Sequence, residues 1–261
     1  MITLRLLREK ISVPQTWQEM TFEQVMNWVE AICLGLNAQE QRSYIICRMS
    51  KKYDAKQLRS YLDTLTNDDK EKAEGEIYRA SEALKFLEEK NTLTFEQVRV
   101  PEGFTLPKAE LTDFKAMEFV LASQYFVAFN KSKNIKDLDE LLCVLLRQEK
   151  GKGERKPLNE AELEYMHRKI KYVSLQEKFC IYKGFEGEYL RLIETYPQVF
   201  EQNGQEGQEV CFPYDFITNN AGEKFGTVDK VEQTEVHIIL QAMVHNIEEY
   251  NKMKKANESM E

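Results

Sequence analysis

Apolar residues recur three and four positions apart along most of this 261-residue chain, a spacing that is typical of amphipathic helices. The spacing predicts helices within residues 20–32, 73–87, 110–129, 135–147 and 236–250. Capping-type pairs predict three more helix starts, at Asn37 with Glu40, Asp54 with Gln57 and Asn159 with Glu162. A further helix is predicted within residues 184–196, because Pro197 stops it. The chain is therefore expected to be mainly α-helical.

The pentapeptide TFEQV occurs twice, at residues 21–25 and 94–98. In the first copy Thr21 is placed to cap a helix, and Gln24 occupies the capping-box position three residues later. The second copy lies in TLTFEQVRVP, which is rich in β-forming residues and ends at Pro101. The same letters are therefore predicted to begin a helix in one place and to lie in a strand in the other.

Two short strands are predicted, one near residues 2–13, which opens with alternating apolar residues, and one near residues 92–100. They would add a small β element to the helices. The change of pattern before Pro107 predicts a boundary there. An N-terminal strand plus helical subdomain is expected over residues 1–107 and a C-terminal helical subdomain over residues 108–261, with one continuous domain as the alternative.

Residues 9–32 and 96–123 align as a longer, degenerate repeat. The alignment pairs Val13-Pro14 with Val100-Pro101, Trp17 with Phe104, Met20-Thr21 with Leu111-Thr112, and Trp28 with Phe119. Each unit reads as a strand, a Val-Pro pair, an aromatic residue, a capping threonine and an amphipathic helix. A true duplication and convergence on a common local solution both remain open.

Composition narrows the classes of partner. The 36 Lys and Arg residues are outnumbered by 44 Asp and Glu, and the net charge of −8 disfavours binding to nucleic acid. No apolar run approaches the length of a membrane span, so a soluble, cytoplasmic protein without a membrane partner is expected. Five widely spaced cysteines without a CxxC pair predict reduced, mostly buried thiols.

The sequence contains no recognisable reactive constellation. The three histidines, at 167, 237 and 245, lack the spacing of metal ligands. GKGERK, at residues 151–156, lacks the GxxxxGK[ST] pattern of a phosphate loop, and residues 151–157 are interpreted as a flexible basic loop. No metal, no cofactor and no enzymatic activity are expected. An enzyme without a recognisable motif stays open as an alternative.

Aromatic residues concentrate in one predicted helix, where they cover more than one face. They are Phe114, Phe119, Tyr125, Phe126 and Phe129. Such a helix is either central in the core, which is the favoured interpretation, or partly exposed as a docking surface. Aromatic side chains dominate binding hot spots, so these five residues, together with Trp17 and Phe104, are the candidate partner-binding residues.

The segment VPQTWQEMTFEQV resembles the opening of a group of tail-assembly chaperones and tail-associated proteins from phages and prophages of Bacteroidetes. Three later stretches are also similar to that group, namely LASQYFVAF, LDELLCVLLRQEKGKGERKPLNEAELEYMHRKIKYVS and GFEGEYLRLIETYPQVF. FITNNAGEKFGTVDKVEQTEVHIILQAM resembles its last segment. The chain departs from the group in lacking a tryptophan near residues 214–216, and residues 54–90 have no counterpart in it.

The resemblance implies a non-enzymatic role in phage tail assembly. The chain is expected to act as a chaperone that binds a protein client, such as a tape-measure polypeptide, in the cytoplasm of the bacterial host. A structural virion protein of the neck, tail or baseplate is the alternative, and its location would be the virion. The oligomeric state is left open.

Overall fold

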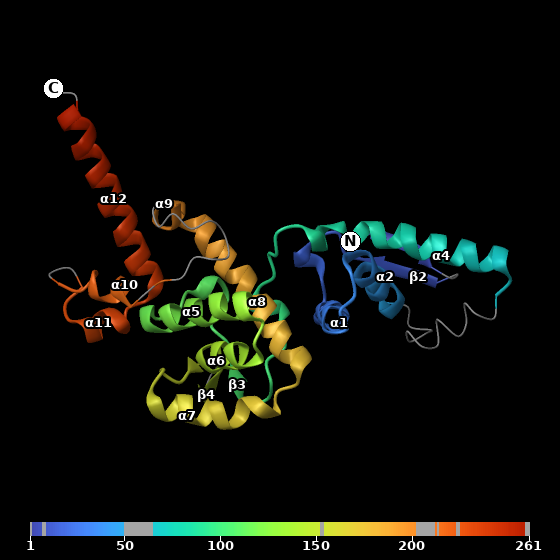
Figure 1. Ribbon diagram of the computed structural model, residues 1–261, viewed down its shortest axis with the longest axis horizontal. Coiled ribbons are helices and arrows are strands. Elements are labelled where there is room, and N and C mark those ends of the chain that lie inside the picture. Colours follow the sequence, from blue (N-terminus) through green and yellow to red (C-terminus); the bar gives the residue numbers. More distant parts are fainter. Residues whose placement is uncertain are drawn as a thin grey trace. The chain divides into compact units, whose positions relative to one another are not determined.

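The computed structural model describes residues 2–6, 9–49, 65–151, 154–201, 212, 214–222 and 225–258 (Figure 1). The chain divides into two compact units. The first comprises residues 1–99 and 175–184, and the second comprises residues 100–174 and 185–261. The boundary expected at residue 107 stays a prediction, and the helix expected after Asp54 lies outside the described residues. A mainly α-helical fold with a small β element is confirmed.

The first unit combines a β-hairpin with a helical layer. In the hairpin, β1 (Ile2–Leu6) pairs antiparallel with β2 (Glu9–Val13), which confirms the strand prediction near residues 2–13. The helical elements that come next are η1 (Trp17–Glu19), α1 (Phe22–Cys33), α2 (Ala38–Met49), α4 (Asn67–Ser81), η2 (Glu82–Glu88) and η3 (Phe95–Gln97). α2 packs against both α1 and α4.

Helix α1 begins as its sequence predicts. The side chain of Gln24 accepts a hydrogen bond from the backbone N–H of Thr21 at 2.9 Å. The N–H of Gln24 in turn donates to Oγ1 of Thr21 at 3.4 Å, which completes the capping box. The helix then buries Val25, Trp28 and Val29 on its inner face. Local sequence therefore determines where this helix starts, and its apolar face determines how it packs.

The strand predicted near residues 92–100 is wrong. The second TFEQV copy forms the short 3-10 helix η3, and Thr94 N–H donates to Oε1 of Gln97 at 3.2 Å. Nε2 of Gln97 donates to the backbone oxygens of Trp17, at 2.5 Å, and Met20, at 3.3 Å. The same threonine–glutamine contact thus turns the chain in both copies, and contacts distant in sequence override the β propensity of the second copy.

The second unit opens with β3 (Phe104–Thr105), η4 (Ala109–Leu111), α5 (Ala116–Ser132) and α6 (Ile135–Leu145). It continues with β4 (Arg147–Gly151), β5 (Glu154–Arg155), α7 (Glu160–Lys169) and η5 (Ile170–Tyr172). Its last elements are α9 (Pro197–Glu201), α10 (Asp215–Thr218), α11 (Val228–Glu232) and α12 (Val236–Glu258). α8 (Leu175–Thr195) gives residues 175–184 to the first unit and the rest to the second.

A small antiparallel sheet and a helical stack organise the second unit. The strands lie in the order β3-β4-β5, and α6 packs against both α5 and α7 (Figure 1). The basic loop predicted at residues 151–157 is therefore partly wrong, because Gly151 ends β4 and Glu154–Arg155 forms β5. Glu154 and Arg155 form a strand because they pair antiparallel with β4, although their own sequence has no β propensity.

Thr112 does not cap a helix, so this part of the proposed repeat is also wrong. Helix α5 begins four residues later, with Lys115 as its N-cap. Backbone hydrogen bonds from Ala116 N to Thr234 O and from Val236 N to Phe114 O, both 2.9 Å, tie the start of α5 to the start of α12. This tertiary pairing determines the first residue of α5.

Candidate functional site

The candidate partner-binding aromatic residues are mostly enclosed within their own units. Trp17, Phe114, Phe119, Phe126 and Phe129 are buried, whereas Phe104 and Tyr125 are half-buried. The favoured interpretation of the aromatic helix as a core element is confirmed by this burial. Trp17 belongs to the first unit and the other six to the second.

Several of these side chains pack in two aromatic clusters, one in each unit. In the first unit, the ring of Trp17 meets Trp28 at 4.9 Å and Phe86 at 5.5 Å between ring centroids. In the second unit, α5 places Phe119 and Phe126 against Tyr189 of α8, at 5.9 and 5.2 Å. Edge-to-face and offset contacts of this kind add stability beyond the burial of area. These rings therefore hold each unit together.

The described residues of the second unit also form a pocket of ≈ 830 Å³, here named the α5–α7 pocket. It lies among the start of α5, strands β4 and β5, the first part of α7 and the end of α11. Its apolar lining residues are Met117, Leu121, Pro157, Leu158 and Leu163. Its charged lining residues include Lys108, Asp113, Lys115, Lys150, Glu154, Lys156, Glu160 and Glu164. A volume of this size is typical of ligand-binding sites.

One wall of the α5–α7 pocket contains a buried charge cluster. Oε1 of Glu118 lies 3.5 Å from Nη2 of Arg147, and its Oε2 lies 3.5 Å from Nη1 of Arg155. The same Oε2 accepts a hydrogen bond from Lys115 N at 3.1 Å. The side chains of Glu118, Arg147 and Arg155 are all more than nine-tenths buried. The Glu118 carboxylate therefore forms ion pairs with two arginines and accepts a hydrogen bond from one backbone N–H.

The two arginines are also bound to the backbone. Nη1 of Arg147 donates to the carbonyl oxygen of Leu146 at 2.8 Å, and Nη2 of Arg155 donates to that of Leu145 at 3.1 Å. Burial lowers the pKa of Arg147 to about 10, and the Glu118 carboxylate opposes that shift. Arg147 thus stays charged at neutral pH. This cluster fixes α5 against the β4–β5 hairpin, and its carboxylate is not free to act as a base.

The three histidines lie in separate places. Nε2 of His167, at the edge of the pocket, lies 2.9 Å from Oε2 of Glu140. His237 contacts Tyr196, and His245 lies 3.2 Å from Glu249. Within the part of the chain that the structure describes, no group of three or more His, Cys, Asp or Glu side chains is placed to hold a metal ion.

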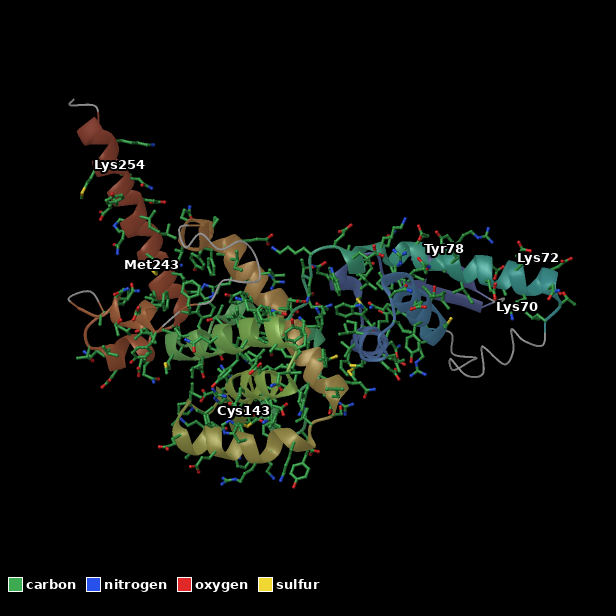
Figure 2. The ribbon with its side chains drawn as sticks, viewed as in Figure 1. Lys70, Lys72, Tyr78, Cys143, Met243 and Lys254 are labelled. Atoms are coloured by element: carbon green, nitrogen blue, oxygen red, sulfur yellow. The ribbon has the colours of Figure 1, made fainter. Side chains whose placement is uncertain are left out.

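The described cysteines are free thiols. Cys143, on α6 (Figure 2), and Cys180, on α8, are buried, Cys47 is partly buried and Cys33 is exposed. Burial raises the pKa of Cys47 to about 11 and that of Cys180 to about 12. Both thiols are therefore protonated and unreactive at neutral pH. Cys211 lies outside the described residues.

Sequence reasoning missed the α5–α7 pocket and its charged wall. One sequence feature could have indicated them, because Glu118 is an isolated carboxylate within the most apolar helical segment, AMEFVLAS. A charged residue at a core position requires an opposite charge nearby. Its partners, however, come from β4 and β5, which the sequence did not predict.

Among the described residues, no helix is both long enough and apolar enough to cross a bilayer. The chain was also compared with known proteins. No protein-family model, no curated protein and no solved structure matches it.

Proposed function

We propose that this chain is a non-enzymatic assembly protein of phage tail morphogenesis, and that it binds a polypeptide client in the α5–α7 pocket. The resemblance of the sequence implies the client class, a tail component such as a tape-measure polypeptide. On this proposal the protein acts as a chaperone in the cytoplasm of the bacterial host and holds its client until the tail polymerises.

The mixed lining of the α5–α7 pocket carries the proposal. Five apolar side chains are surrounded by lysines and carboxylates, so the pocket has no single dominant charge. A polypeptide offers apolar side chains together with polar backbone groups and charges of both signs, and such a lining complements it. The charged residues then orient the segment while the apolar residues supply most of the affinity.

The resembling segments also contribute most of this pocket. Residues 150–167 belong to the stretch from Leu138 to Ser174, which is similar to the phage group, and Leu121 opens the similar stretch LASQYFVAF. The part of the sequence that suggests tail assembly and the part that forms the pocket are therefore largely the same.

A binding experiment tests the pocket. The full chain is co-expressed with tail-gene products, including a tape-measure polypeptide, and the client retained in the soluble complex is measured. The variant Leu158→Ser with Leu163→Ser removes two half-buried lining side chains. We expect client binding to fall at least about tenfold, because truncated apolar anchors at a binding site cost this much or more.

Tyr172→Ser provides the matched control. Tyr172 is 76% exposed, follows α7 in sequence and does not line the pocket. Its loss should leave client binding unchanged. Equal binding by the pocket variant, with an unchanged circular dichroism spectrum, would contradict the pocket as the client site.

The structural virion alternative is separated by mass spectrometry of purified particles. A chaperone should be absent from the virion or present far below the copy number of tail proteins. A fixed stoichiometric amount in the neck, tail or baseplate would instead support a structural role.

A further inference from the structure

Two neighbouring residues, close in sequence to the lining of the α5–α7 pocket, have a strained backbone. Glu110 and Leu111, in η4, adopt φ angles of 59° and 57°. These angles lie in the left-handed region, which residues with a Cβ atom rarely occupy. Two consecutive residues of this kind require contacts that hold them there.

Both backbone polar groups of Glu110 are held by side chains from distant elements. Its N–H donates to Oε2 of Glu188 on α8 at 2.9 Å. Its carbonyl oxygen lies 2.6 Å from Nε2 of His237 on α12. A carbonyl can only accept, so Nε2 of His237 carries a proton and donates it to this oxygen. Nδ1 of the same ring lies 2.8 Å from the hydroxyl of Tyr196.

The groups that hold Glu110 are themselves fixed. Glu188 is fully buried, and its Oε2 lies 3.0 Å from Nη1 of Arg191. Tyr196 is buried, and its ring packs against that of His237 at 5.6 Å between centroids. The strained peptide is therefore held by preorganised partners, here named the latch and defined as Glu188, His237 and Tyr196.

The strained residues lie between two residues that line the pocket. Lys108 and Asp113 both contribute to the lining, and Lys108 N donates to Oδ1 of Asp113 at 2.8 Å. Beyond Asp113 the chain is fixed again, because Ala116 pairs with Thr234 at the start of α12. Residues 108–113 thus form a short segment whose two end residues line the pocket and whose middle is held by the latch.

We infer that residues 108–113 are a strap that controls access to the α5–α7 pocket, and that the latch holds this strap in a strained, closed conformation. Breaking the latch releases the strain at Glu110 and Leu111, and this release favours opening. The inference concerns regulation of the site of the proposed function, but it can be tested on the protein without its client.

Methionine oxidation reports the opening directly. Met117 lines the pocket and is half-buried, so its conversion to the sulfoxide by hydrogen peroxide should follow the position of the strap. Met253, which is 64% exposed on α12, is the internal standard for reagent. Met166, fully buried on α7, reports general loosening of the same unit. Peptide mapping by mass spectrometry measures all three in the full chain.

The test variant is His237→Phe, which keeps an aromatic ring against Tyr196 but removes the bond to Glu110. We expect Met117 oxidation to rise roughly fivefold or more relative to Met253, as the loss of one hydrogen bond to a closed state predicts. The matched control is His245→Phe, on the same helix between Met243 and Lys254 (Figure 2). It should leave the Met117 rate unchanged.

A rescue variant separates a strained strap from simple loss of packing. Glycine adopts positive φ without strain, so Glu110→Gly in the His237→Phe background should return Met117 oxidation toward the wild-type rate. An unchanged Met117 rate in His237→Phe, or a parallel rise at Met166, would overturn the strap. Client binding does not enter these measurements, so they stand whether or not the pocket proves to be the client site.

Discussion

Helices α1 and α5 both begin with a side chain that accepts a hydrogen bond from the backbone of the N-cap residue. In α1, Gln24 accepts from Thr21 N at 2.9 Å, and in α5, Glu118 accepts from Lys115 N at 3.1 Å. Gln24 is neutral and satisfies a local need of the helix. Glu118 also faces Arg147 and Arg155, so the equivalent position in α5 joins three elements.

The two TFEQV copies extend this comparison. Both start with a contact from the threonine N–H to the glutamine side chain, but only the first continues into a long helix. In the second copy Gln97 also bonds to the turn that precedes α1, and Phe95 and Val98 pack in the core. A local start motif therefore does not determine the length of the helix that it begins.

The largest expected effect comes from the charged start of α5. Glu118→Ala leaves Arg147 and Arg155 buried without their carboxylate, and we expect a loss of about 3–5 kcal/mol in the free energy of unfolding. Gln24→Ala, the matched change in α1, should cost only about 1 kcal/mol. Urea unfolding, with hydrogen exchange to assign the loss to a unit, measures both. Equal losses would show that the two helix starts are equivalent.

The second copy of the pentapeptide can be tested through Gly184 on α8. A Cβ at this position would lie 2.7 Å from Cγ2 of Val98, a buried and stiff side chain. We expect Gly184→Ala to destabilise the first unit by about 1–3 kcal/mol, because an overpacked core must shift. Gly75→Ala, in open space on α4, is the control and should stabilise by up to about 1 kcal/mol. If Gly184→Ala leaves the stability of the first unit unchanged, the contact between Gly184 and Val98 is loose.

Gln97 tests whether the second copy supports the first. Gln97→Ala removes donors to the backbone oxygens of Trp17 and Met20, and we expect a loss of about 1–2 kcal/mol. Gln18→Ala is the control, since its side chain is exposed and donates to the hydroxyl of Thr92 at 2.9 Å, a contact at the surface. Thermal and urea unfolding report the difference. Equally small losses of stability in Gln97→Ala and Gln18→Ala would show that the second copy does not stabilise the first.

The smallest expected effect tests the alignment of the proposed repeat. Thr21→Ala removes a real N-cap and should cost about 1 kcal/mol. Thr112→Ala, the aligned position, should stay within about 0.5 kcal/mol because Thr112 is exposed and does not cap α5. The two midpoints of urea unfolding are compared directly. A larger loss of stability in Thr112→Ala would show that Thr112 has a role like that of Thr21, as the alignment of the two units requires.

Prediction from the sequence succeeded where structure depends on neighbouring residues. The start of α1 follows from Thr21 and Gln24, and the stop before Pro197 follows from a missing N–H and a steric clash. It failed at residues 92–100 and at Thr112. There, Gln97 bonds to residues about 80 positions away, and the start of α12 determines the start of α5.

The sequence by itself therefore determined a mainly helical chain, with its strongest caps, its core-facing aromatic helix and the β structure near residues 2–13. Only the tertiary structure decided the division of α8 between two units, the Glu118 cluster, the α5–α7 pocket and the strained strap. The physical reason is the sequence separation over which the stabilising interactions act. Caps and periodicity act over three or four residues, whereas a buried charge or a left-handed peptide is stable only when distant segments of the chain supply its partners.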